Sequence, residues 1–204
     1  GATLLDDYET RNKAQLLISD QLSANFPLSS TEMADLADVS FRGESANEQQ
    51  KSYSPADITN FFANDIASDY YAYSTRREDA AMLFEEAMMS HRLSILRDVA
   101  VTDRPEVVAA DTISVNWGQR GRIGDDTLQS RAAFVIDQIL PELDAVALVE
   151  SLPQPIPMIQ GNTWSQNSLI SPTLNKNIQR VSSSVQNVAP PLRFSGNRHA
   201  APVQ

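Results

Sequence analysis

The spacing of apolar side chains predicts helices over the first third of the chain. Residues 4–26 place leucine and tyrosine at helical spacing among charged residues, which predicts one amphipathic helix that ends before Pro27. The run Ser-Ser-Thr-Glu at 29–32 is a capping-box pattern and predicts a short helix to about Asp38. We expect a polar loop over residues 42–52.

Two more helix starts follow this loop. Ser54 supplies a capping side chain and Pro55 suits the first helical position, so a helix with one buried side is expected to reach about Ile66. Thr75 opens the longest uninterrupted helical pattern, which is expected to run to about Val99.

The pattern becomes more mixed in the second half. Residues 112–115 can form a short strand, and residues 117–124, which contain three glycines, are expected to form a compact loop. A helical pair should follow, the first helix capped by Asp126 and the second beginning at Pro141 and reaching about Leu152.

Composition divides the chain into two regions. All 26 acidic residues lie before residue 151, whereas four of the 16 basic residues follow it. Seven of the eleven prolines also lie beyond Leu152, among serine, asparagine and glutamine. We therefore predict a mainly α-helical, bundle-like acidic body over residues 1–150. An extended, acid-free strap or tail over 151–204 is expected to pack on it through opposite charge.

Net charge, apolar runs and cysteine count also limit which kinds of function fit this sequence. An acidic body with net charge −10 repels phosphate backbones, and the basic residues form no dense patch, which argues against nucleic acid as a partner. No apolar run approaches the roughly 20 residues of a membrane-spanning helix. The absence of cysteine excludes disulfides and thiolate sites but leaves the compartment open. The start Gly-Ala-Thr indicates a trimmed or processed part of a longer protein.

Residues 71–84 carry the most informative chemistry. Their sequence, YAYSTRREDAAMLF, resembles the third-ligand helix of the gluzincin zinc peptidases, notably the lethal-factor-like group and uncharacterised bacterial peptidases similar to it. The resemblance implies that Glu78 is the third zinc ligand and that Tyr71 hydrogen-bonds the oxyanion, with Tyr73 as the alternative in another loop register.

The same resemblance shows what is missing. The chain has no H-E-x-x-H turn, and its only histidines are His91 and His199. Two histidines and a glutamate base would have to come from an upstream segment, so zinc is expected only in the longer protein and this chain alone should be an inactive C-terminal portion of a peptidase. A peptide substrate is implied, and the family slightly favours the cell envelope or secretion.

One departure concerns the support of the ligand. Where the family often has a second glutamate one turn after the ligand, this chain has Met82, so Asp79 or Glu85 would have to orient Glu78.

The local explanations remain open beside this one. Glu78 also occupies the third helical position, where a glutamate can cap the helix start, and the tyrosines at 70, 71 and 73 can be core or interface aromatics. In that case the chain is a non-enzymatic helical interaction or scaffold domain. His91 is expected to be a hydrogen-bonded core residue, and Glu85, Glu86 and Arg92 a solvated face.

Two other patterns carry less chemistry. Arg120 and Arg122 lie in the glycine-containing segment, but the segment lacks the Lys-Ser/Thr ending of a phosphate-binding loop, so a structural role is favoured. The serines at 182–184 have no base nearby in sequence and fit the composition of the tail.

Overall fold

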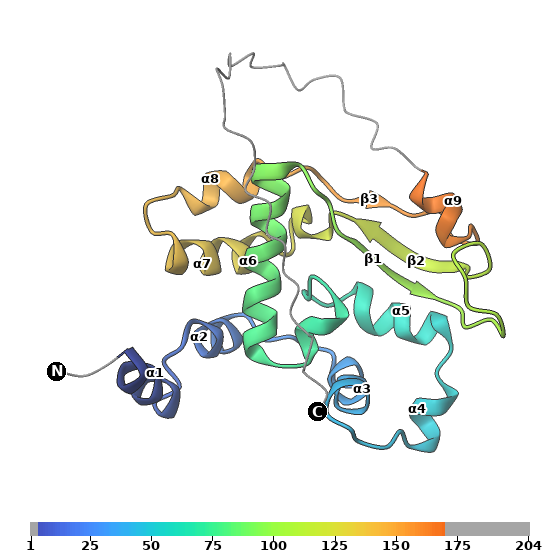
Figure 1. The fold of residues 1–204 in the computed structure, drawn as a ribbon, viewed down its shortest axis with the longest axis horizontal. Helices are drawn as coiled ribbons and strands as arrows, with labels where there is room; N and C mark the ends of the chain where they lie inside the picture. Colours follow the sequence, from blue (N-terminus) through green and yellow to red (C-terminus); the bar gives the residue numbers. More distant parts are fainter. Residues whose placement is uncertain (1–3, 170–204) are drawn as a thin grey trace, which may run out of the picture. The chain divides into compact units, whose positions relative to one another are not determined.

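The structure, a computed structural model, describes residues 4–169 and confirms a mainly helical body (Figure 1). The predictions for the strap beyond residue 169, including its packing on the body, lie outside the described residues. The helices are α1 (Leu4–Lys13), α2 (Ile18–Asn25), α3 (Thr31–Phe41), α4 (Glu48–Ser52), α5 (Pro55–Ala63), α6 (Arg76–Leu93), α7 (Gln129–Ile139), α8 (Ala145–Glu150) and α9 (Trp164–Ser168). The strands are β1 (Asp98–Thr102), β2 (Val115–Arg120) and β3 (Ile156–Pro157), and two 3-10 turns are η1 (Tyr70–Tyr73) and η2 (Arg122–Gly124).

Helix α6 is the centre of the larger hydrophobic core. Helices α2 and α7 pack against it, and α8 packs on α7 (Figure 1). The core includes Leu22 of α2, Leu83 of α6 and Ile136 of α7, all fully buried. No helix among residues 4–169 is both long and apolar enough to cross a membrane.

The single helix predicted over residues 4–26 is wrong, because the chain forms two helices there. Gln15 adopts a left-handed backbone with φ of 55°, and Leu17 is extended at the start of α2. α2 buries Leu22 against α6, whereas α1 has no buried residue. Apolar residues of α2 therefore pack in the core, whereas those of α1 do not, and the chain turns between the two helices.

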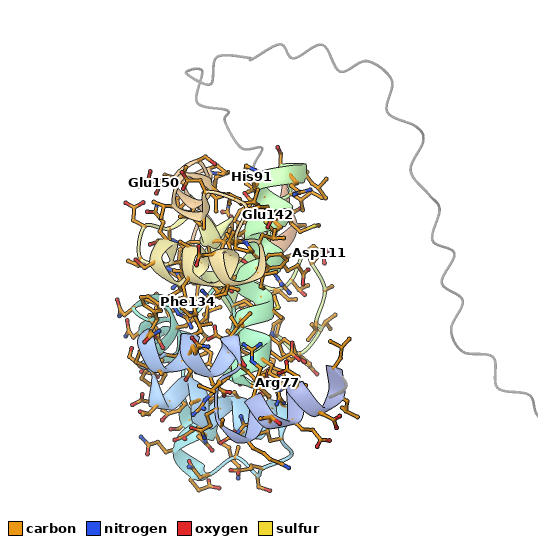
Figure 2. All side chains as sticks on the ribbon, turned by 90° about the vertical axis from the view of Figure 1, so that its left-hand side faces the viewer. Arg77, His91, Asp111, Phe134, Glu142 and Glu150 are labelled. Atoms are coloured by element: carbon orange, nitrogen blue, oxygen red, sulfur yellow. The ribbon has the colours of Figure 1, made fainter. Side chains whose placement is uncertain are left out.

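The long helix from Thr75 is correctly placed at its start but ends earlier than predicted. Thr75 caps α6, and the helix stops at Leu93, where Ser94 takes a left-handed φ of 54°. Val99 and Val101 then alternate in β1 instead of continuing the helix, as β-branched residues favour. His91 is consequently exposed near the end of α6, which corrects its prediction as a core residue (Figure 2).

A small antiparallel sheet replaces the first half of the loop predicted over residues 117–124. Its strand order is β1-β2-β3, and Trp117 to Arg120 belong to β2. Gly118 has a packing role there, because an added Cβ would lie 2.6 Å from Met158 Sδ and 2.9 Å from the Ala100 side chain. The close approach of the strands thus requires glycine.

A second hydrophobic cluster joins this sheet to the helices before it. It contains Met33 and Ala37 of α3, Phe62 of α5 and Tyr73 of η1, with Val99 and other partly buried residues packed against it. Figure 1 shows α5 lying alongside β1, and the contacts of α5 with β1 and β2 agree.

Several short elements were not predicted, and one predicted helix, α8, begins later than expected. α4 lies within the expected polar loop and is capped by Asn47, whose side chain accepts from Gln50 N. α8 begins at Ala145 after the capping residue Asp144 rather than at Pro141. Within residues 151–169, where only extended structure was expected, β3 pairs with β2 and α9 is capped by Thr163.

Candidate functional site

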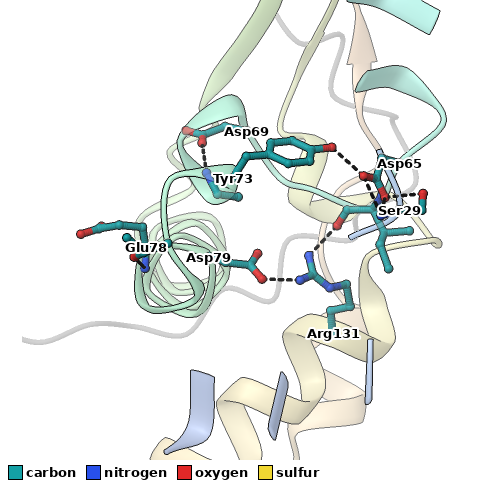
Figure 3. A network of polar contacts seen from close by, with 10 residues as sticks. Ser29, Asp65, Asp69, Tyr73, Glu78, Asp79 and Arg131 are labelled. Atoms are coloured by element: carbon teal, nitrogen blue, oxygen red, sulfur yellow. Dashed lines mark hydrogen bonds and ion pairs between the residues drawn. The ribbon is translucent and has the colours of Figure 1, made fainter. Parts of the chain in front are cut away.

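The start of α6 separates Glu78 from its neighbour Asp79. The Thr75 side chain caps the helix, because Glu78 N donates to Thr75 Oγ1 at 3.1 Å. The half-buried Glu78 carboxylate makes no hydrogen bond or ion pair with any residue between 4 and 169. The carboxylate does not return to the backbone as a full capping box would. Figure 3 shows Glu78 and Asp79 pointing to different sides of the helix.

Asp79 is held in the interior. Its carboxylate forms an ion pair with Arg131, and the two side chains are among the most buried of the molecule (Figure 3). Burial raises the pKa of Asp79, while the guanidinium of Arg131 acts in the opposite direction. Asp79 therefore serves the packing of α6 against α7 in this body.

The two candidate tyrosines, Tyr71 and Tyr73, likewise differ in burial. Tyr71 is 41% exposed, and its ring packs edge-on against Phe41 with 5.2 Å between centroids. Tyr73 is buried and donates its hydroxyl proton to Asp65 at 2.7 Å. Burial, followed by the contact with the Asp65 carboxylate, raises the pKa of Tyr73 well above its ordinary value.

The predicted site residues thus fall into two groups. Tyr73 and Asp79 lie in the interior, whereas Tyr71, Glu78 and Glu85 keep access to solvent. Among the described residues, no three histidine or carboxylate side chains are grouped so that they could hold a metal ion.

Tyr73 and Asp79 belong to what we call the buried network, formed with Asp65, Arg122 and Arg131. Asp65 accepts hydrogen bonds from the backbone of Ser29 and Ser30 at 2.9–3.0 Å as well as from Tyr73 (Figure 3). Burial opposes ionisation of Asp65, but these hydrogen bonds outweigh it and hold the pKa below its ordinary value.

The two arginines of the network bind backbone carbonyls of the segment between α5 and η1. Arg122 donates to Asp65 O at 2.7 Å and to Ala67 O at 2.8 Å, and Arg131 donates to Ile66 O at 2.6 Å. The Arg122 guanidinium also lies over Phe62 and Trp117, 4.9 and 5.2 Å from their ring centroids. Both arginines are thereby tied to this segment, so the network fixes the fold there.

A second buried carboxylate lies further along α6. Glu86 was expected on a solvated face but is 5% exposed. Burial, followed by the negative charge of Asp69, raises its pKa to about 7. Arg97 opposes this shift and bridges the two carboxylates, 3.6 Å from Glu86 and 3.3 Å from Asp69.

An apolar hollow lies elsewhere, along β1. It has a volume of about 440 Å³, and we call it the β1 groove. Helices α3 and α5, strand β1 and nearby residues line it: Met33, Leu36, Tyr53, Pro55, Ile58, Phe62, Tyr70, Val99, Ala100, Val101, Thr102 and Arg104. Four of these are consecutive residues of β1. Since alternate side chains point to opposite faces, the edge of the strand itself borders the groove.

The backbone of Ala100 is directed toward this edge. Ala100 lies opposite Gly118, whose carbonyl accepts from Met158 N at 2.9 Å on the far side of β2. Gly118 therefore turns its backbone groups away from β1, and the pair is not hydrogen-bonded. Val115, opposite Thr102, likewise bonds residues 161 and 162. The N–H and C=O groups of Ala100 and Thr102 consequently face outward, and no residue from 4 to 169 hydrogen-bonds them there.

Comparison of the whole chain with protein-family models, with curated proteins and with solved structures gave no match.

Proposed function

We propose that the described body is a non-enzymatic interaction domain that binds an extended polypeptide segment along the β1 groove. The observation that carries this proposal is the outward backbone edge of β1 beside an apolar hollow of about 440 Å³. An extended segment can add to such an edge through main-chain hydrogen bonds, while pockets beside the edge take alternate side chains.

The groove supplies both kinds of contact. Ala100 and Thr102 offer backbone donors and acceptors at the positions where an added strand would pair. Leu36 and Ile58 contribute apolar surface from α3 and α5. Burying this surface favours binding by roughly 25 cal/mol per Å² before the cost of ordering the segment. The ligand class is therefore an extended segment with apolar side chains at alternate positions.

Substitution of Ala100 by proline tests the edge directly. Proline removes the outward N–H and leaves the ladder with β2 intact, since Ala100 makes no hydrogen bond to Gly118. An acetylated, amidated octapeptide of alternating valine and serine, carrying a fluorophore, is the probe. We expect the wild-type chain to raise its fluorescence anisotropy and Ala100→Pro to weaken binding at least tenfold.

The matched control is Ala100→Ser, which keeps the backbone donor and should bind as the wild type does. Amide hydrogen exchange provides an independent readout, because the probe should slow exchange at Ala100 and Thr102. Unchanged exchange at these two amides in the presence of a bound probe would contradict the proposed mode. Thermal unfolding of each variant establishes that it is folded.

A second candidate function is the third-ligand part of a zinc-dependent peptidase. Two side chains favour it: the half-buried Glu78 carboxylate and the Tyr71 hydroxyl have no hydrogen-bond partner among the described residues. Both remain available to a segment that brings two histidines and a glutamate base. The residues described here supply one carboxylate, so the metal site is incomplete without that segment. Zinc would provide the Lewis acidity, with Tyr71 donating to the oxyanion and Glu85 orienting the ligand.

The test of this candidate uses a longer protein that carries the upstream segment. Glu78→Gln should lower its zinc content after dialysis, measured by mass spectrometry, and abolish peptide hydrolysis. The exposed Glu142 provides the control Glu142→Gln, which should keep both. Equal zinc content in the two variants would remove Glu78 from the metal site.

A further inference from the structure

Arg104 is the one charged residue among those that line the β1 groove. It follows β1 by two positions and is exposed. Within residues 4–169, its guanidinium makes no hydrogen bond or ion pair. The positively charged Arg104 side chain thus lies at one end of an apolar hollow, and its N–H donors have no partner among the described residues.

The other arginines around the sheet are engaged. Arg97 pairs with Asp69 and Glu86, and Arg120 pairs with Asp98 at 2.6 Å. Arg122 donates to backbone carbonyls of the segment after α5. Arg104 differs from all three because no residue from 4 to 169 pairs with its guanidinium.

We infer that the segment bound in the β1 groove carries a carboxylate that pairs with Arg104, an inference that rests on the proposed function. A guanidinium presents a planar set of donors that match the two oxygens of a carboxylate. The apolar walls of the groove exclude water from one side of this pair and strengthen it relative to an open surface pair.

The position of Arg104 restricts where the carboxylate lies in the segment. β1 runs from Asp98 toward Arg104, and Ala100 is four residues before it, a separation of about 13 Å along a strand. A segment added parallel to β1 brings its C-terminal end to Arg104. A segment added antiparallel brings its N-terminal end there. The carboxylate accordingly lies at the C-terminal end of the segment in the first orientation, and is an acidic side chain near the N-terminus in the second.

Three octapeptides of alternating valine and serine separate these sources. The first is acetylated and amidated, the second is acetylated with a free C-terminal carboxylate, and the third is acetylated and amidated with glutamate in place of its second residue. We expect the second or the third to bind the wild-type chain about five- to tenfold more tightly than the neutral first peptide. The peptide that gains affinity identifies the orientation of the segment.

The gain should depend on Arg104. Arg104→Gln should abolish the difference in affinity between the charged and the neutral peptide, and Arg104→Lys should keep only part of that difference, because lysine lacks the bidentate geometry. Arg92→Gln is the control, since Arg92 is an exposed arginine at the far end of α6 and lies outside the groove. Raising the salt concentration should reduce the gain without affecting the neutral peptide.

The outcomes separate the two proposals. If all three peptides bind equally and protect the Ala100 amide, the role of Arg104 is overturned while the proposed function stands. If none binds, the proposed function fails as well. Decanoate serves as a further probe: if it binds in an Arg104-dependent way and the peptides do not, the groove is a site for an acyl chain and both statements are wrong.

Discussion

The buried network and the β1 groove both contain arginine side chains, but the two regions use them differently. In the network, Arg122 and Arg131 donate to backbone carbonyls and to Asp79, and both are nearly fully buried. In the groove, Arg104 is exposed and has no partner among the described residues. The guanidinium groups of the network are therefore committed to contacts within the body, whereas that of Arg104 is available to a partner. Structure and binding can be tested separately by substituting one or the other.

The largest effect on stability should come from Arg131→Leu. This change leaves the Asp79 carboxylate buried without its ion pair, and removing one partner of a buried pair costs about 3–5 kcal/mol. Chemical denaturation followed by circular dichroism measures the loss. The double variant Arg131→Leu/Asp79→Leu should recover much of it, because no uncompensated charge remains. A loss below about 1 kcal/mol for the single variant would show that the pair does not hold α6 to α7.

A pH-dependent effect of somewhat smaller size is expected at Glu86. Its pKa is raised to about 7 in the folded chain, because burial and the charge of Asp69 disfavour the carboxylate more than Arg97 favours it. The folded chain binds a proton on Glu86 more tightly than the unfolded chain does, and this protonation stabilises the fold. The stabilisation is fully present below the ordinary pKa of about 4.5 and is lost as pH rises through about 7.

Glu86→Gln should therefore flatten the dependence of unfolding free energy on pH between about 4.5 and 7. At pH 8 it should raise stability by up to about 3 kcal/mol, the value that corresponds to the shift. Denaturation curves at several pH values measure this, and Glu85→Gln on the exposed side of α6 is the control. A wild-type stability that rises over the same interval would contradict the assigned direction.

Tyr73→Phe should have a moderate effect. It removes the hydroxyl that donates to Asp65 at 2.7 Å while keeping the buried ring. The loss should be about 1–3 kcal/mol, since a buried carboxylate oxygen loses one partner. Tyr71→Phe should change stability by less than about 0.5 kcal/mol, because the Tyr71 hydroxyl has no partner among the described residues. Similar losses in the two variants would mean that the network does not depend on the Tyr73 hydroxyl.

The features that could be predicted from the sequence are those set by neighbouring residues. Ser54 and Thr75 were expected to begin helices, and each side chain accepts from the amide three positions later. The capping-box run at 29–32 also predicted a helix start, and there the cap is Ser30. Such caps depend on local geometry alone. The mainly helical character of the body follows from the same local patterns.

The features that could not be predicted depend on distant partners. β1 contains only five residues, and its pairing partner β2 lies beyond a connection of twelve residues. Arg131 bonds the carbonyl of Ile66, which lies 65 positions away and carries no sequence signature as an acceptor. The β1 groove likewise needs α3, α5 and β1 to be placed together. The resemblance at residues 71–84 indicated possible chemistry for Tyr71 and Glu78, and it gave no information about this groove.

The smallest effect on stability is expected from Arg104→Gln, and it returns to the difference between the two regions. Because Arg104 is exposed and makes no interaction within residues 4–169, its loss should change the free energy of unfolding by less than about 0.5 kcal/mol. Arg131→Leu removes the same guanidinium group and should cost several times more, so the two variants form a matched pair in one denaturation experiment. If Arg104→Gln instead costs about 2 kcal/mol, Arg104 has a structural partner and the groove is not open at this end.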